Sequence, residues 1–599
     1  MHSSILLRNP NDRDLMAKHP NILMLTVDAL RADRTSLYGY NRPTTPTLER
    51  LEKDAVVCDQ AFSLGPFTQS AAVQLFTSTA PLSHGGFDAG AAGRPDTLFK
   101  HFQANGYRTT AISTLHWVNR FFGYGSGLDV EHQLFIPNTL VGVAVATMRN
   151  SLTGYYTGAI GRDEMLAVVR PTIAKLFEDA DSYCMSRLEH EQEHARDYPD
   201  SLFVNEGYDF ARVRRLVLRH KNEFEGNPAG YVDRHLNRVP APHEWLAADW
   251  RLCRSPARLA GEVMFRLFNR ILGLAWPSLA SARSARFRQY VDAGALADKT
   301  IAELRTVNSD KPFLIWCHFM DTHVPYVSGH GRKWYRQTSN YLKRLGYPKT
   351  RDPALNFRET RPQHPDRQKE VATLYDAAVL WTDEQIGRII DVLDETGMAK
   401  DTIVMVCGDH GEELGEHGDV GHYFLFYEHN VRVPMIFRRK GMKPVRLAGL
   451  RTILDVAPTL ADMAGLPPAA GWIGEPMESA AAAARVHVVM ETFYGGNCLF
   501  EHRPLYFAAR SHTHKLIWSE ARDPADTFSP DGPQLFDLTV DPGEHRNIYA
   551  TDHPALAPLE TAIARRMAEI PELSADRVVA AFGETGERAI AEIRSGATS

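Results

Sequence analysis

The 599-residue sequence predicts an α/β fold, a doubly wound and mostly parallel sheet with a helical insertion and a small C-terminal α+β subdomain. Three short apolar segments support this prediction, since each has the pattern of a buried parallel strand and ends in acidic or histidine residues. These segments are residues 21–28, 312–321 and 402–410. Helical patterns lie between them, and alternating strands and helices are typical of a doubly wound sheet.

The helical patterns have clear ends. Residues 97–105 and 371–396 are each followed by a glycine, which suits the left-handed conformation at a helix C-terminus. We therefore expect the main α/β domain to comprise residues 20–130 and 310–480.

Residues 131–309 differ from this pattern, with charged helical stretches at 163–198 and 210–224 and little strand character. We interpret the segment as a helical insertion, either a lid or packing element or a region with chemistry of its own. Its apolar runs at 134–148 and 259–282 are interrupted by Asn, Pro, Arg or Glu. Neither run predicts a membrane-spanning helix, and both are expected to be buried helices.

The C-terminal residues 481–599 contain short strand-like pieces followed by a turn-rich segment. This pattern predicts a small α+β subdomain. The pieces are residues 486–490, 505–509 and 535–538, and the turn-rich segment is 541–544.

The composition is that of a globular protein, with 44% hydrophobic and 23% charged residues and a net charge of -6. Such a charge gives no basic field for nucleic acid. Residues 1–20 lack the apolar core of a secretory signal, and the six cysteines show no CxxC spacing. These features favour a reducing cytoplasm, and the oligomeric state stays open.

Asp28, Asp409 and His410 each stand at the expected carboxyl end of a strand, where open α/β sheets bind ligands. Carboxylate and imidazole are ligand types for a divalent ion. The surrounding residues 26–33 (TVDALRAD) and 408–418 (GDHGEELGEHG) closely resemble the metal motifs of the sulfatase family, within the alkaline-phosphatase superfamily. The resemblance covers residues 20–125 and 310–550, with further matching segments at 318–326, 427–434, 535–538 and 541–544.

Thr68 stands where sulfatases have the Cys or Ser that is converted to formylglycine. Ser70 and Ala72 replace the proline and arginine of that signature, so formylglycine is not expected. Threonine at this place is similar to the phosphate-handling relatives, where the hydroxyl is the nucleophile. A divalent ion on Asp28, Asp409 and His410 could also bind Thr68 and lower the pKa of its hydroxyl. The alternative is a threonine that only caps a helix.

The expected chemistry favours phosphate. A sulfated threonine has no easy route to release, whereas a phosphorylated threonine can pass its group on by in-line displacement. The resemblance implies that His318, His323 and His422 are oxyanion donors or a leaving-group acid, although each could be a structural histidine. Asp321, His323 and His422 are the candidates for a second metal site.

Two departures from the family bear on the metal. Ala29 replaces a second aspartate, and His422 stands where many members have a lysine. Among Mn²⁺, Zn²⁺, Mg²⁺ and Ca²⁺, this set favours a transition metal. His116 stands where a sulfatase stretch can touch the anion, and Arg31 and Arg34 could bind an anionic substrate or make turn contacts.

The sequence thus predicts a metal-dependent hydrolase of a sulfate or phosphate ester, with phosphate favoured. One alternative is a phosphotransferase that moves a head group to an acceptor alcohol, and the other is a catalytically inactive binding protein. We expect a small-molecule, lipid-linked or glycan-linked anionic ester as substrate, but the sequence does not identify it.

Overall fold

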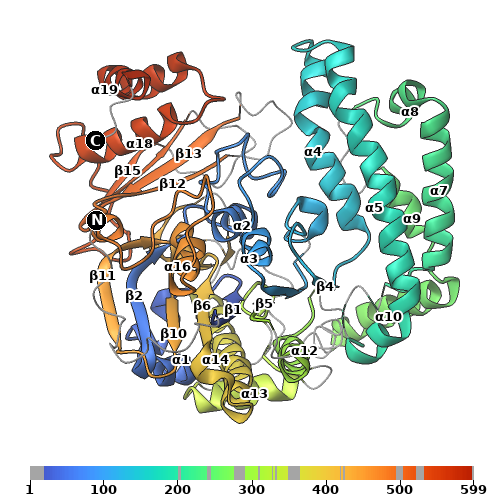
Figure 1. The fold of residues 1–599 in the computed structure, drawn as a ribbon, viewed down its shortest axis with the longest axis horizontal. Helices are drawn as coiled ribbons and strands as arrows, with labels where there is room; N and C mark the ends of the chain where they lie inside the picture. The colour runs from blue at the N-terminus through green and yellow to red at the C-terminus, as the bar shows by residue number, and fades with distance from the viewer. Residues whose placement is uncertain are drawn as a thin grey trace.

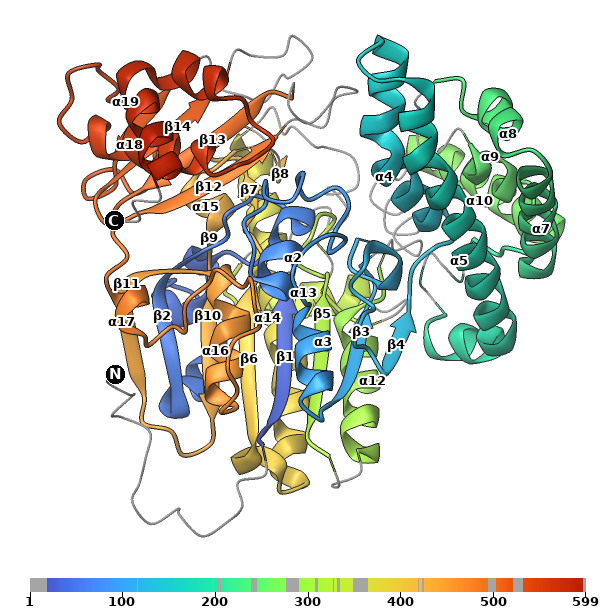
Figure 2. The same cartoon turned by 45° about the horizontal axis from the view of Figure 1, so that its top comes forward.

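The computed structural model describes residues 19–595, apart from several segments. Those segments are 116, 200, 202–203, 205, 239–244, 276–289, 308–310, 327, 331–333, 348–364, 419, 423–424, 494–502 and 521–531. Three regions are visible in Figures 1 and 2: a large central sheet with its helices, a helical insertion to its right, and a smaller C-terminal sheet above it at the left.

The central sheet has nine strands, in the order β11-β2-β10-β6-β1-β5-β3-β4 with β9 paired to β2. Apart from the antiparallel pairings that β10 and β9 make, its strand pairs are parallel. The strands are β1 (Asn21–Val27), β2 (Ala55–Phe62), β3 (Arg108–Ser113), β4 (Val130–Gln133), β5 (Phe313–Phe319), β6 (Thr402–Gly408), β9 (Arg432–Val433), β10 (Met435–Arg439) and β11 (Val445–Thr452).

Helices cover both faces of this sheet, as predicted (Figure 2). One apolar core packs under α1 (Pro46–Leu51), α12 (Ala293–Thr306), α13 (Trp334–Arg344) and α14 (Pro365–Glu395). The other packs under α2 (Thr68–Thr77), α3 (Leu98–Ala104) and α16 (Val456–Met463). Every residue of β1 from Ile22 to Val27 is buried, which explains its uninterrupted apolar sequence.

The insertion has an apolar core of its own. Its helices are α4 (Asn138–Thr157), α5 (Arg162–Asp197), α7 (Phe210–Gly226), α8 (Pro228–His235), α9 (Leu246–Arg251) and α10 (Pro256–Ala275). The apolar run at 134–148 contributes buried side chains such as Val141 and Met148, as predicted. The prediction for the run at 259–282 was wrong in part: α10 is a helix, but one of its faces is exposed, and residues 276–282 lie outside the described part.

The C-terminal subdomain is an antiparallel sheet of β12 (Val488–Phe493), β13 (Leu505–Arg510), β14 (His514–Ser519) and β15 (Gln534–Asp537), covered by α18 (Leu556–Ala568) and α19 (Ala575–Ser595). Lys515 joins it to the rest of the protein. The buried Lys515 ammonium lies 2.8 Å from both Glu428 and Glu544. Glu428 belongs to α15 (Glu428–Val431), so the ion pair between Lys515 and Glu428 holds the subdomain against the central domain.

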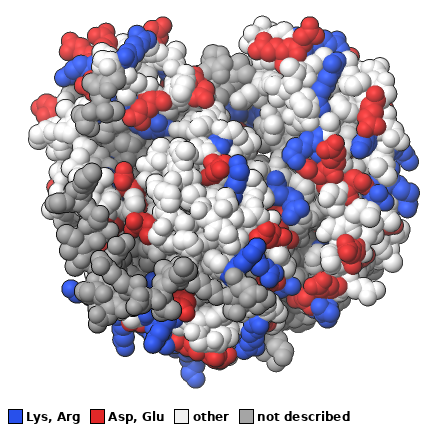
Figure 3. Space-filling model, viewed as in Figure 1, with Lys and Arg blue, Asp and Glu red and all other residues white. Residues whose placement is uncertain are grey.

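The surface carries charges of both signs. On the face drawn in Figure 3, acidic and basic side chains are interspersed, which fits the mild net charge of -6. Among the described residues, no helix has both the length and the apolar character needed to cross a bilayer.

Candidate active site

Two neighbouring strands deliver the two carboxylates of the site. β1 and β6 pair in parallel with Val27 opposite Gly408, so the residues that follow, Asp28 and Asp409, leave the same edge of the sheet. Both side chains are buried. Ala29 adopts a positive φ of 54°, and its N–H donates to Asp409 Oδ1 at 3.0 Å.

His410 is held as a neutral imidazole. Its Nδ1 lies 2.7 Å from the Gly411 carbonyl oxygen, so Nδ1 carries the proton and Nε2 keeps a lone pair. Burial and the neighbouring His422 lower the pKa of His410 to about 3. Its Nε2 points to the carboxylates, at 3.9 Å from Asp28 Oδ1 and 3.7 Å from Asp409 Oδ2.

Thr68 faces this group from the first residue of α2. Its Oγ1 lies 2.9 Å from Asp28 Oδ2 and 3.2 Å from His410 Nε2. The cap of α2 is Phe67, and no side chain makes the capping hydrogen bond. The reading of Thr68 as a helix cap is therefore wrong. Its hydroxyl lies at the positive end of the helix dipole, which favours an anion there.

The donor set fits a divalent cation. Ligand atoms of Asp28, Asp409 and His410 lie within 4.8 Å of one another. Asp28 Oδ1 and Asp409 Oδ2 are buried and lack a hydrogen-bond partner among the described residues. Burial and the Asp28 carboxylate raise the pKa of Asp409 well above its usual range. A cation between the two carboxylates would relieve this repulsion and satisfy both oxygens.

His318, on β5, lies next to the Asp28 carboxylate. Trp316 Nε1 donates to Thr26 Oγ1 at 2.8 Å, and Thr26 Oγ1 lies 2.7 Å from His318 Nδ1. Because Thr26 already accepts from Trp316, its hydroxyl proton can go to His318 Nδ1. Nε2 then carries the ring proton, 3.6 Å from Asp28 Oδ2.

His422 and His323 complete a row of imidazoles. The His422 ring centroid is 4.4 Å from that of His410 and 4.9 Å from that of His323. His422 Nδ1 lies 3.2 Å from the buried Glu412 carboxylate. Burial alone would lower the pKa of His422, but Glu412 raises it above its usual value.

The structure thus brings all seven predicted site residues together: Asp28, Thr68, His318, His323, Asp409, His410 and His422. Sequence reasoning missed Thr26 and Glu412, although both lie inside the quoted motifs. Thr26 contacts His318 and Glu412 contacts His422. The spacing of residues in the sequence does not show these contacts.

Other predicted residues have different partners. Asp321 accepts hydrogen bonds from Trp381 Nε1 at 2.9 Å and Ala293 N at 2.7 Å, so each of its two oxygens has a protein donor. The Arg31 guanidinium is buried and pairs with Asp33 and Glu416, both at 2.7 Å.

Arg34 lies 3.6 Å from Asp376 and from Glu416. Arg31 and Arg34 therefore make the ion pairs of a turn rather than a substrate clamp. His116 lies outside the described residues.

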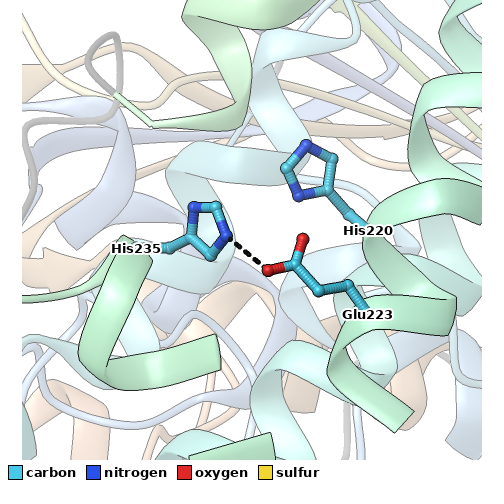
Figure 4. A group of neighbouring side chains, drawn as sticks. All are labelled: His220, Glu223 and His235. Carbon is cyan, nitrogen blue, oxygen red and sulfur yellow. Dashed lines mark hydrogen bonds and ion pairs between the residues drawn. The ribbon is translucent and has the colours of Figure 1, made fainter. Parts of the chain in front are cut away.

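The insertion holds another group of ligand-type side chains, His220, Glu223 and His235. In Figure 4 the His235 ring faces the Glu223 carboxylate, with the His220 ring beside them. His235 Nε2 lies 3.1 Å from Glu223 Oε1. Arg234 donates to the same oxygen at 2.9 and 3.1 Å. The Arg234 guanidinium thus already places a positive charge beside Glu223. The three side chains are therefore part of an ion-pair cluster.

A third group, Glu413, His417 and His429, lies under the C-terminal subdomain. His417 Nε2 lies 3.1 Å from the Glu544 carbonyl oxygen. Its ring stacks on Tyr427 at 3.7 Å between centroids. The contact with Glu544 ties His417 to the C-terminal subdomain.

Comparison with known proteins identifies the family. A family model described as Sulfatase matches residues 20–159 and 222–466, more than half of the chain. The chain belongs to the sulfatase family. The match also enters the segment 131–309, which the motif resemblance had left out.

Curated relatives of this sulfatase-family chain align over part of its length. Rat arylsulfatase K is 28% identical over 46% of the chain and 53% of the relative. The choline-sulfatase of Rhizobium meliloti is 30% identical over 42% of the chain and 50% of the relative. The chain thus spans about half the length of the curated relatives it matches.

Solved structures show the same fold. A protein crystallised with D-glucosamine-2-N,6-O-disulfate is 16% identical, with a TM-score of 0.50 and coverage of 89% of this chain and 94% of that chain. The yidJ protein of Bacteroides fragilis, assigned as a sulfatase, is 15% identical, with a TM-score of 0.52 and coverage of 94% and 98%. At these identities the likeness concerns the fold alone.

Proposed function

We propose that this sulfatase-family protein hydrolyses an anionic ester through Thr68, and that it prefers a phosphate ester to a sulfate ester. One observation carries the proposal: Thr68 Oγ1 points into the group formed by Asp28 and His410, at 2.9 and 3.2 Å. A threonine hydroxyl here can attack directly, without the aldehyde that other sulfatases need.

The metal ligands in this proposal are Asp28, Thr68, Asp409 and His410. When bound, a divalent ion would favour the ionised Thr68 hydroxyl and polarise the ester oxygens. An imidazole and only two carboxylates favour Mn²⁺ or Zn²⁺ over Mg²⁺ or Ca²⁺.

The protein's own groups account for the proton transfers. Thr68 Oγ1, after releasing its proton to solvent, forms a bond to phosphorus while the bond from phosphorus to the leaving oxygen breaks. His318 Nε2–H points toward Asp28, next to Thr68, where it can donate to a non-bridging oxygen of the transferred group. His422 gives its proton to the leaving oxygen, because Glu412 favours the protonated ring. His323 lies beside His422 and orients it.

A second displacement regenerates the enzyme. Water attacks the phosphothreonine and Thr68 leaves as the ionised hydroxyl that began the cycle, with His422 now accepting a proton from the water. A sulfated threonine would need the same attack at sulfur, since it has no aldehyde into which to collapse. The second step therefore favours phosphate, although the curated relatives carry the names of sulfatases.

The test is an assay of the purified protein with added Mn²⁺, Zn²⁺, Mg²⁺ or Ca²⁺. The substrates are aryl sulfates, aryl phosphates, phosphodiesters, phosphonates, choline sulfate and choline phosphate. We expect phosphate esters or phosphonates to turn over fastest, with Mn²⁺ or Zn²⁺. Turnover of sulfate esters alone would contradict the preference.

Two alternative functions give different results in this experiment. A phosphotransferase would release the alcohol faster than inorganic phosphate when an acceptor alcohol is present. An inactive binding protein would turn over nothing, and it need not retain a stoichiometric ion after removal of loosely bound metal. The cytoplasmic location stays a prediction.

A further inference from the structure

Helix α10 of the insertion presents a row of large apolar side chains to solvent. Seven of the fifteen large apolar side chains that the described residues expose lie between 252 and 274, with exposed fractions from 52% to 86%. They are Leu252, Val263, Met264, Leu267, Phe268, Ile271 and Leu274. Isolated exposed apolar residues are common, but a contiguous patch on one helix marks an interaction surface.

The spacing places these residues on one side of the helix. At 100° per residue, positions 263, 264, 267, 268, 271 and 274 fall within an arc of about 140°. On the opposite side, Asn269 is buried and Leu272 is partly buried. One side of the helix is thus buried, while its apolar side faces solvent. In an ordinary surface helix the apolar side faces the protein core instead.

The charge of this region is opposite to that of the whole chain. Residues 251–275 contain five arginines and one acidic residue, Glu262, whereas the chain has a net charge of -6. Arg251 and Arg270 are exposed. Helical geometry puts positions 266 and 270 along one border of the apolar arc. An exposed apolar face bordered by arginines is typical of helices that lie in the interface of an anionic membrane.

We propose that α10 binds the surface of a bilayer that contains anionic lipid, with its apolar face in the acyl boundary and Arg270 at the head groups. The charge argues against a second copy of this chain on the same face, because a twofold contact would bring two sets of arginines together. A spanning role is also excluded for this helix, since it does not meet the requirements for crossing a bilayer.

The position of α10 allows such docking. Figures 1 and 2 both place it in the insertion, away from the C-terminal subdomain. The residues of the candidate active site are not part of the patch, so the proposal does not depend on catalysis.

The test is sedimentation of the full-length protein with vesicles of phosphatidylcholine alone or mixed with phosphatidylglycerol. The parent should bind the mixed vesicles, bind phosphatidylcholine at least tenfold more weakly, and dissociate at high salt. The double variant Leu267→Glu/Ile271→Glu should lose binding at least tenfold. Arg270→Glu should weaken binding to the mixed vesicles only.

The matched control is Val168→Glu/Met185→Glu on α5, where the two side chains are 38% and 47% exposed. It should bind like the parent, and circular dichroism should show that both double variants are folded. The proposal is overturned if the parent does not bind the mixed vesicles or if the α10 variant binds as well as the parent. A parent that is dimeric while the α10 variant is monomeric would overturn it in favour of contact between copies.

Discussion

Thr68 Oγ1 donates a hydrogen bond to Asp28 Oδ2 at 2.9 Å, although the two residues are 40 positions apart in the chain. Asp28 follows the central strand β1, and Thr68 is the first residue of helix α2. The hydroxyl proton of Thr68 therefore points at a carboxylate whose other oxygen, Oδ1, has no hydrogen-bond partner among the described residues. This arrangement suits a hydroxyl that must lose its proton.

The metal ligands can be tested first through Asp409. Asp409→Ala should remove both the bound metal and the activity, because it deletes a ligand and one of two buried charges. The measurements are metal content by mass spectrometry and turnover of the best substrate. Asp391→Ala, an exposed site on α14, is the control and should keep both. An Asp409→Ala protein with its full metal content would show that Asp409 is not a ligand.

Thr26 should act as a positioning residue for His318. Thr26→Val removes the hydroxyl that lies between Trp316 Nε1 and His318 Nδ1, so His318 loses the partner that keeps the proton on Nε2. We expect kcat to fall about 10- to 100-fold with little change in KM, by analogy with lost partners of metal-site histidines.

Thr26→Ser restores the hydroxyl and should recover most of kcat. A role in packing alone would give the opposite order, because valine matches the shape of threonine better than serine does. A Thr26→Val enzyme with the kcat of the parent would remove Thr26 from the mechanism.

Asp383 should make stability depend on pH. It accepts hydrogen bonds from the N–H groups of Thr47 and Leu48, yet burial raises its pKa to about 7. Since the folded pKa lies above the usual value of 3.8, protonation stabilises the fold. This contribution is full below pH 4 and is lost as the pH rises through about 7, with a total of ~4 kcal/mol.

The measurement is the melting temperature between pH 5 and pH 8. The parent should lose more stability over this range than Asp383→Asn, which cannot ionise. Asp391→Asn, on the same helix but exposed, should follow the parent. Parallel curves for the parent and Asp383→Asn would contradict the raised pKa.

The sequence predicted the parts of the site that follow from topology. Asp28 and Asp409 end adjacent parallel strands, so their convergence needs only the strand pattern. Asp321 also follows a strand, but its carboxylate accepts from Trp381 and Ala293. That choice depends on which helices pack against β5, and the local sequence does not contain this information.

Helix α10 is a second case in which the local sequence does not determine the tertiary contacts. The run at 259–282 was predicted to be a buried helix. α10 is a helix, yet the predicted burial was wrong because six of its large apolar side chains are more than half exposed. Periodicity shows which residues share a side of a helix. Whether that side meets the protein's own core depends on tertiary packing.

The nucleophile gives the sharpest test, because Thr68 is where this chain departs from other sulfatases. Thr68→Ala should bind the ion more weakly and reduce turnover by several orders of magnitude, whereas Thr68→Ser should keep part of both. Thr68→Cys should not create a formylglycine enzyme, since Ser70 and Ala72 replace the proline and arginine of the modification signature. Intact-mass measurement under substrate should show a phosphate adduct at Thr68 when the second displacement is slow. Thr77→Ala, at the other end of the same helix, is the control and should turn over like the parent. If Thr68→Ala does so too, the covalent mechanism is wrong, and direct attack by an activated water becomes the better account.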